Sequence, residues 1–525
     1  MPYNLKIAGA SDRLCEESVN AAEVALDVPP TVVDAPARID ETGAELKRGA
    51  FLNTIAMLAS NLFGIFVLLV ARLLGPAALG TFSVAWANTD LISKFAVFGL
   101  DNAITTFIAR SQATREFARS RTLFQVAVIL VLLQSCLVAA IGIVALQLFG
   151  DQLHFPREMI SALGFLLCAL PGIALYRVCT SISRGMKVMK HDIVSRGMTE
   201  PAISVLALLI ALGFGFTKFA PELAAVCGTA ASGIVALILA AKLFSGVSAC
   251  DTFSIWTEAK RLLAYAAPIS VYQIFNAFIL RLDVIMLGWF IGRAPGVTLA
   301  TVGIYGATVD IAGGLRKVNQ AFNPIFAPVV AGMTATGDQQ RAAATYARLA
   351  EWILWILLPL VAVMTLAGSV ILLIYGPAFS QGGAWLGIVG VACATNAFVS
   401  LGETVIMVQR PHLNLLNSSV ACAVAFGANL WLIPRFGVTG AAFGVLLPYV
   451  VQGILRYGVL RLVFRWRNPW SSFRRPIFAA VIAFLPAFGC RLLLDGVTGQ
   501  VVAGVVFLAI FGASWLHHRR STKPA

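Results

Sequence analysis

Charged residues are scarce in this sequence. Only 12% of its 525 residues are Asp, Glu, Lys or Arg, and 59% are hydrophobic. Soluble globular chains carry about 25% charged residues. This composition excludes a water-soluble fold and predicts an all-α polytopic membrane protein. We expect no nucleic acid among its partners.

Motifs for metal binding, redox chemistry and nucleotide hydrolysis are also missing. The nine cysteines include no CxxC pair, none of the five histidines belongs to an HExxH motif, and no Walker sequence is present. We therefore expect no disulfide, no metal site, no cofactor and no enzymatic activity.

The first 46 residues lack the basic and apolar regions of a cleavable signal peptide. They carry nine acidic and three basic residues, a composition typical of disordered chains. Removing their net charge of −6 from the overall +14 leaves +20 on residues 47–525. We expect a disordered cytoplasmic tail, followed by a first membrane helix that serves as the insertion signal.

Apolar runs long enough to cross about 30 Å of hydrocarbon recur from Ala50 almost to the C-terminus. Divided at glycine, proline and charged residues, they predict about fourteen transmembrane helices, beginning near residues 50, 78, 122, 158, 190, 219, 262, 298, 348, 382, 411, 437, 474 and 498. Alternate loops hold 24 basic residues on one side and essentially four on the other. The positive-inside rule therefore predicts an inner-membrane protein with both termini in the cytoplasm.

Three short sequences recur at nearly one spacing, each in a loop predicted outside the cytoplasm. The pairs are "GTF" at Gly80 with "GIY" at Gly303, "LFG" ending at Gly150 with "IYG" ending at Gly376, and "FGFT" at Phe214 with "FGVT" at Phe436. Their offsets along the chain, 223, 226 and 222, predict a parallel two-fold repeat of six helices. The expected parts are a tail at 1–46, six-helix lobes at 47–245 and 246–470, and two further helices with a basic tail at 471–525.

Segments spread over residues 49–465 carry a family resemblance. They are "ARLLGPAALGTFSVA" from Ala71, "RLDVIMLGWFIG" from Arg281, "VGIYGAT" from Val302, "LLIYGPAF" from Leu372 and "PRFGVTGAAFG" from Pro434. They resemble the polysaccharide-transporter branch of the multidrug/oligosaccharidyl-lipid/polysaccharide (MOP) superfamily, which includes Wzx-type oligosaccharide flippases. None is a catalytic signature, and the resemblance assigns no role to any single residue.

The resemblance implies a flippase that exports a polyprenyl-pyrophosphate-linked oligosaccharide by alternating access, among membrane lipids and alongside polymerase and glycosyltransferase machinery. A MATE-type cation or drug antiporter would share the architecture but should have a cavity rich in carboxylates. Internal acids and bases number five each, so charge alone separates the two poorly. A membrane glycosyltransferase would need large extramembrane loops, and the loops predicted outside the cytoplasm are short.

Charges inside apolar runs are the candidate functional residues, because each costs about 2.5–3.5 kcal/mol at mid-bilayer and normally faces a bundle interior. The candidates for binding an anionic substrate are Lys94, Arg177, Arg281, Arg316 and Lys317. Those for gating or coupling are Asp90, Asp283, Asp310 and Glu403, and a further internal acid is Glu200. Arg72 and Arg456 lie nearer helix ends and are expected to extend to the interface.

The offset that relates Gly80 to Gly303 also places Lys94 on Lys317. If both lysines line the cleft between the lobes, their ammonium groups can hold one pyrophosphate from opposite sides. The alternative is neutralisation within each helix, by Asp90 four residues before Lys94 and by Asp310 seven residues before Lys317.

The offset that relates Gly150 to Gly376 places Arg177 on Glu403. A pair between them, across the lobes, could close an inward gate. The alternative, which we favour, is that each residue pairs within its own lobe. Arg281 and Asp283 are two residues apart and point to different sides of a helix, so one is expected at the cleft and the other against a neighbouring helix.

Overall fold

The computed structural model describes residues 62–153, 155–245, 254–335, 338–466 and 470–521, which form helices and turns without a strand. The predicted acidic tail lies outside these residues. The first predicted lobe holds α3 (Phe63–Val97), α4 (Leu100–Ala113), α5 (Phe117–Phe149), η1 (Gly150–Leu153), α6 (Arg157–Leu167), α7 (Leu170–Gly185), α8 (Lys190–Asp192), η2 (Ile193–Thr199), α9 (Glu200–Gly213) and α10 (Ala220–Lys242).

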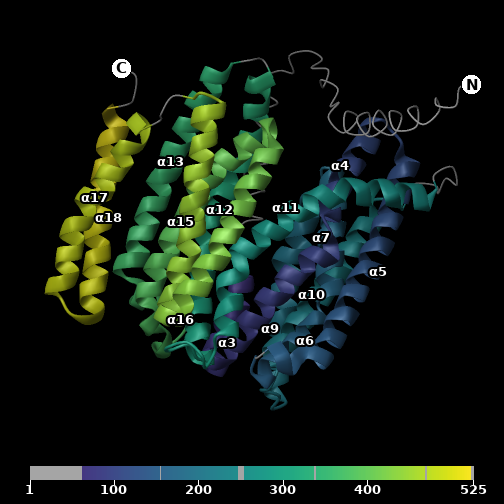
Figure 1. Ribbon diagram of the computed structural model, residues 1–525, viewed down its shortest axis with the longest axis horizontal. Helices are drawn as coiled ribbons and strands as arrows, with labels where there is room; N and C mark the ends of the chain where they lie inside the picture. Colours follow the sequence, from purple (N-terminus) through teal and green to yellow (C-terminus); the bar gives the residue numbers. More distant parts are fainter. Residues whose placement is uncertain (1–61, 154, 246–253, 336–337, 467–469, 522–525) are drawn as a thin grey trace, which may run out of the picture. The chain divides into compact units, whose positions relative to one another are not determined.

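The second predicted lobe follows directly along the chain. It holds α11 (Ile255–Trp289), α12 (Leu299–Ala335), α13 (Gln339–Leu366), α14 (Gly368–Leu372), η3 (Pro377–Gly382), α15 (Gly383–Gln409), α16 (Pro411–Gly458) and η4 (Val459–Val463). The chain ends with α17 (Trp470–Leu493) and α18 (Gly496–Ser521), drawn in yellow in Figure 1. The all-α class is therefore confirmed for the described residues.

Ten helices among the described residues are long and apolar enough to cross a membrane, or eleven if the bent pair α6 and α7 counts as one span. Two of the ten contain a break, because the backbone leaves the helical conformation at Gly75 in α3 and at Gly437 in α16. The 48 residues of α16 correspond to about 72 Å of helix, more than twice the hydrocarbon thickness of about 30 Å. The polytopic architecture is confirmed, and the number of fourteen stays a prediction.

Two backbone features agree with the predicted two-fold repeat. Gly215, after α9, has φ +77°, and Gly437, inside α16, has φ +57°. Glycine adopts positive φ without steric cost, so each residue marks a tight turn between two helices. They occupy the same place in the "FGFT" and "FGVT" landmarks, which the repeat relates. Helices α3 and α12, which carry the matched Gly80 and Gly303, pack directly against one another.

The last two helices form their own apolar cluster with α13. On α17 the small residues Ala479, Ala483 and Ala487 recur every four positions and are buried. Such a face allows helices to approach closely inside a membrane. Phe507 and Phe511 of α18 pack in the same cluster. Helices α17 and α18 are therefore attached mainly through α13, as an addition to the repeat.

Helix α11 connects the two lobes. Its first half packs with α4 and α5 in the cluster that contains Ala259, Leu262 and Ala266. Its second half joins the largest cluster through Ile279 and Leu282. One continuous helix is thus shared between the two cores.

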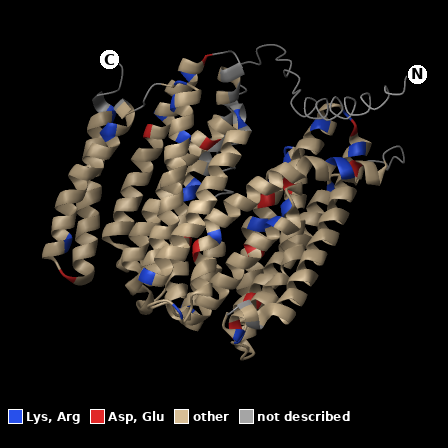
Figure 2. Ribbon diagram, viewed as in Figure 1, with Lys and Arg blue, Asp and Glu red and all other residues tan. Residues whose placement is uncertain are grey.

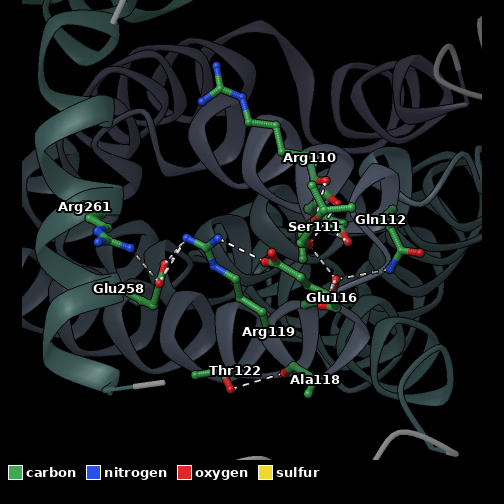
Figure 3. A network of polar contacts seen from close by, with 12 residues as sticks. Arg110, Ser111, Gln112, Glu116, Ala118, Arg119, Thr122, Glu258 and Arg261 are labelled. Atoms are coloured by element: carbon green, nitrogen blue, oxygen red, sulfur yellow. Dashed lines mark hydrogen bonds and ion pairs between the residues drawn. The ribbon is translucent and has the colours of Figure 1, made fainter. Parts of the chain in front are cut away.

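A buried carboxylate fixes the start of α11. Glu258 lies between Arg119 of α5, at 3.1 Å, and Arg261, at 3.3 Å (Figure 3). Arg119 also contacts the more exposed Glu116 at 3.1 Å. The start of α5 is therefore tied to the helix that leads into the second lobe.

Candidate functional site: a charged cavity beside Asp90

Asp90 on α3 binds two arginines from other helices. Its Oδ1 accepts a hydrogen bond from Nη2 of Arg177 on α7 at 2.8 Å, and its Oδ2 accepts one from Nε of Arg281 on α11 at 3.0 Å. Arg177 lies in the first predicted lobe and Arg281 in the second. One partly buried carboxylate therefore joins the two lobes through ion pairs that water screens only weakly.

The sequence of α3 directs this carboxylate inward. Ser83, Ala87 and Asp90 recur at helical spacing and share one face of α3. Ser83 and Ala87 line an internal cavity, so the face that carries Asp90 points toward the interior. Figure 2 shows charged segments at the helix ends and a further group midway along otherwise uncharged helices.

The cavity lies between α3, α11 and α12 and has a volume of about 470 Å³. Its α3 wall is aromatic, with Phe82 and Trp86 stacked at 5.8 Å. Its charged residues are Arg281, Asp310, Arg316 and Lys317. Three cations against one carboxylate create a positive potential, which attracts anions.

Two internal carboxylates accept hydrogen bonds from tyrosines. The hydroxyl of Tyr375 donates to Oδ2 of Asp310 at 3.0 Å, and that of Tyr305 donates to Oδ2 of Asp283 at 2.6 Å. Asp283 is only 1% exposed and does not line the cavity, whereas Arg281 does. These two residues therefore point to different sides of α11, as their spacing predicts.

The structure does not bring Lys94 to the cavity that Lys317 lines. Asp90 forms its ion pairs with the two arginines, and Lys94 lies within electrostatic range of the same carboxylate. A pyrophosphate site shared by the two lysines stays a prediction. Arg196 of η2 lies within electrostatic range of both Lys94 and Lys317. The two lysines thus lie near the same arginine, Arg196, but only Lys317 lines the cavity.

Glu403 pairs within its own lobe, with Arg456 of α16 at 2.8 Å. It also accepts a hydrogen bond from the hydroxyl of Tyr272 on α11. Arg177 and Glu403 thus each pair inside their own lobe in this conformation, the alternative favoured from the sequence. The expectation that Arg456 extends to the interface is wrong, because this side chain is 2% exposed and held by Glu403.

Sequence reasoning missed the tyrosines that bind the carboxylates, although a signal for them existed. Tyr305 belongs to the "GIY" landmark and Tyr375 to the "IYG" landmark. The matching landmarks of the first lobe place them on Phe82 and Phe149, which lack a hydroxyl. A polar change at matched positions of a repeat indicates where the second lobe carries an additional function.

Comparison with known protein families accounts for this architecture. Residues 46–330, more than half of the chain, match the family described as polysaccharide biosynthesis protein. The chain belongs to this polysaccharide biosynthesis protein family. No curated protein matches it in sequence. The resemblance to the polysaccharide transporters of the MOP superfamily is confirmed.

Solved structures with the same fold include a flippase and drug transporters. The lipid II flippase MurJ in an inward closed conformation superposes with a TM-score of 0.68, at 11% identity, over 90% of this chain and 99% of MurJ. An inward-facing multidrug resistance MATE family transporter of the MOP superfamily gives 0.64, at 15% identity, over 79% of this chain and 98% of its own. A mutant of the Vibrio cholerae MATE transporter VcmN gives 0.58, at 14% identity, over 82% and 99%.

The chain is therefore a multi-span membrane protein of the polysaccharide biosynthesis protein family, with a fold that it shares with a flippase and with MATE transporters. The family-specific part of the chain includes α3, α7 and α11, which carry Asp90 and its two arginines. Helix α12 begins inside the same matched range and contributes the remaining cations of the cavity.

Proposed function

We propose that this member of the polysaccharide biosynthesis protein family is a flippase that exports a polyprenyl-pyrophosphate-linked oligosaccharide to the outer leaflet by alternating access. The observation that carries the proposal is the cationic cavity between α3, α11 and α12. Arg281, Arg316 and Lys317 would bind the pyrophosphate through charge-assisted hydrogen bonds, each contributing about 1.5–3 kcal/mol. The fold shared with a lipid II flippase supports this assignment.

Asp90 is the proposed gate. It holds Arg281, which also lines the cavity, so a pyrophosphate there competes with Asp90 for the same guanidinium. Exchange of one anion for the other would release α3 from α11 and link substrate binding to movement between the lobes. Arg177 and Lys94, the other cations near Asp90, would then neutralise the released carboxylate.

The remaining carboxylates are proposed to couple or stabilise this movement. Asp310 lines the cavity and accepts a hydrogen bond from Tyr375, so a charged ligand in the cavity would change its electrostatic environment. Asp283 and Glu403 are each held by a tyrosine from another helix, Tyr305 and Tyr272. Both pairs connect α11 to the second lobe.

The test is translocation of a fluorescent polyprenyl-pyrophosphate oligosaccharide by the full-length protein in vesicles. A membrane-impermeant quencher should reach label from both leaflets when the protein is present and from the outer leaflet alone without it. Arg281→Gln should slow this exchange strongly, whereas Arg435→Gln, which removes an arginine stacked on Trp431 outside the cavity, should not. Equal effects of the two variants would contradict the proposed cavity.

A cation antiporter is the second candidate, favoured by the MATE structures that share the fold. The cavity argues against it, because three cations and one carboxylate repel a cationic drug. Efflux of ethidium driven by a sodium or proton gradient, without lipid translocation in the same vesicles, would establish this alternative.

The same proposal includes the membrane location, the lobe boundaries and the partner enzymes of the protein. The charge asymmetry of the loops supports an inner-membrane location with both termini in the cytoplasm. We retain the lobe boundaries at residues 47, 246 and 471. Glycosyltransferases would supply the lipid-linked glycan, and a polymerase would use it after export.

A further inference from the structure

A second cavity lies within the second lobe and shares no lining residue with the first. It has a volume of about 800 Å³ between α13, α15, α16, η4 and the start of α17. Pockets of roughly 300–1,000 Å³ hold small molecules. Its charged residues are Arg456, Arg461 and Arg465, and no acidic residue is among the described side chains that line it.

Arg456 lines this cavity and carries buried guanidinium atoms without a hydrogen-bond partner. The side chain is 2% exposed, and its Nη2 forms the ion pair with Glu403. Its Nε and Nη1 have no hydrogen-bond partner among the described residues. A buried donor without a partner costs about 1–3 kcal/mol, so these two atoms indicate an anionic ligand.

The rest of the cavity wall is mainly aromatic and apolar, with a few uncharged polar side chains such as Gln339. Trp466 is held by a hydrogen bond from its indole Nε1 to Gln339 at 3.1 Å, and its carbonyl accepts one from Nη1 of Arg461 at 3.0 Å. Arginine beside tryptophan is typical of the headgroup level of a membrane. Here Trp466 and Arg461 both lie in the wall of the cavity.

The cavity continues onto the surface that faces lipid. Ile454 and Tyr457 line it and are 66% and 46% exposed. Exposed apolar side chains on a membrane-spanning helix contact acyl chains. A ligand that fills this cavity therefore has an anionic part for the arginines and an apolar part that extends into the bilayer.

We propose that this cavity binds an acidic glycerophospholipid. Its phosphate would accept hydrogen bonds from Nε and Nη1 of Arg456, with Arg461 and Arg465 at the rim, and an acyl chain would lie along Phe398 and Ile454. Basic pockets between transmembrane helices bind anionic lipid headgroups for this reason. Charge complementarity selects an acidic over a zwitterionic lipid, because the described lining residues include three arginines and no carboxylate to pair with an ammonium group. The proposal does not depend on the flippase assignment.

The experiment measures lipid retained by the delipidated full-length protein in detergent, with native mass spectrometry as the readout. The probe is dioleoyl phosphatidylglycerol, compared with dioleoyl phosphatidylcholine. The site variants are the double change Arg461→Gln with Arg465→Gln, and Ala344→Trp, which fills the cavity from an exposed position on α13. Arg456→Lys keeps the charge beside Glu403 and removes the planar donors. The control is Arg348→Gln, an exposed arginine of α13 outside the cavity.

We expect the unmodified protein and the Arg348→Gln control to retain phosphatidylglycerol, and every site variant to bind it at least about tenfold more weakly. Equal retention by the site variants would overturn the proposal. So would equal binding of phosphatidylcholine, complete displacement by inorganic phosphate, or stronger binding of a polyprenyl phosphate. The last result would assign the cavity to the lipid carrier. No transport is measured, so failure of the flippase proposal would not affect this outcome.

Discussion

Gly80 on α3 and Gly303 on α12 pack backbone against backbone where the two helices cross. A Cβ on Gly80 would lie 3.0 Å from N of Gly303 and overlap the carbonyl oxygen of Leu299. A Cβ on Gly303 would lie 2.8 Å from N of Gly80 and overlap the carbonyl oxygen of Pro76. The repeat places Pro76 on Leu299 and Gly80 on Gly303, so each contact is the image of the other. A two-fold axis at this crossing would impose such an exchange, so the predicted repeat has its axis here.

Alanine at this crossing should destabilise the protein. Gly80→Ala and Gly303→Ala each force the helices apart, and overpacking typically costs about 1–3 kcal/mol. The control is Gly427→Ala on α16, where a Cβ meets nothing within 4 Å and the better helix propensity of alanine should be neutral or stabilising. Thermal unfolding of the purified protein measures all three. Unchanged stability of both crossing variants would contradict the close contact.

The sequence predicted the architecture because the signals for it are local. Apolar length, loop charge and the glycine landmarks were sufficient to predict an all-α membrane protein and the repeat offset that Gly80 and Gly303 display. The partners of the internal charges could not be predicted in the same way. Asp90 meets Arg177 and Arg281 from 87 and 191 residues away, and helix rotation decides which charges meet.

Arg456 shows the same difficulty in another form. Its position near a helix end predicted a side chain that reaches the membrane interface. Instead, Arg456 forms an ion pair with Glu403 of the preceding helix and is buried in the protein. Charge spacing along one helix does not reveal a partner on another. Matched positions of the repeat would have identified Tyr305 and Tyr375, because their equivalents in the first lobe are phenylalanines.

Asp90→Asn should strengthen substrate binding and slow transport. The neutral amide no longer competes for Arg281, so a pyrophosphate meets a free guanidinium, while the link that re-forms between α3 and α11 is lost. We expect binding of a polyprenyl pyrophosphate to tighten several-fold and vesicle translocation to fall by about tenfold, the scale of one charge-assisted hydrogen bond. Asp495→Asn, in the turn before α18, is the control. Weaker binding by Asp90→Asn would show that Asp90 positions Arg281 rather than competing for it.

The two lysines related by the repeat should differ in their effects. Lys317→Gln removes a charge from the cavity wall and should weaken pyrophosphate binding by about tenfold or more, whereas Lys94→Gln, outside the cavity, should have a much smaller effect. Lys317→Arg should be mild, because it keeps the charge. The double Gln variant should be additive, since additivity holds for sites without a shared partner. Strong non-additivity would instead support one pyrophosphate site shared by both lysines.

Membrane topology can be tested independently of any substrate. The loop charges predict cytoplasmic signals from reporter fusions after Arg119, Lys190 and Arg467, and external signals from fusions near Gly150, Lys218 and Gly376. Helix α5 runs from Phe117 to Phe149, so the fusions at its two ends should report opposite sides. Each fusion site is tested with two reporters, one that is active only in the cytoplasm and one that is active only outside it. The ratio of their activities gives the side of the membrane on which the site lies. A consistent inversion would contradict the positive-inside prediction.

The two carboxylates that bind Arg119 provide a matched test of how α11 is held. Glu258 has a side chain only 3% exposed and accepts from two arginines, whereas Glu116 is 40% exposed and pairs with Arg119 alone within one helical turn. Glu258→Gln leaves both guanidiniums without their buried counter-ion and should cost about 1–3 kcal/mol of stability. Glu116→Gln should cost less than about 1 kcal/mol, because exposed ion pairs contribute little.

Thermal unfolding at low and high salt separates the two cases, since only the exposed pair is strongly screened. Glu258 joins the start of α5 to the helix that is shared between the two cores (Figure 3). Its loss should therefore also slow translocation more than the loss of Glu116 does. If the two variants prove equally stable and equally active, the start of α11 is held by its apolar contacts alone, and the network around Arg119 has no part in the movement of the lobes.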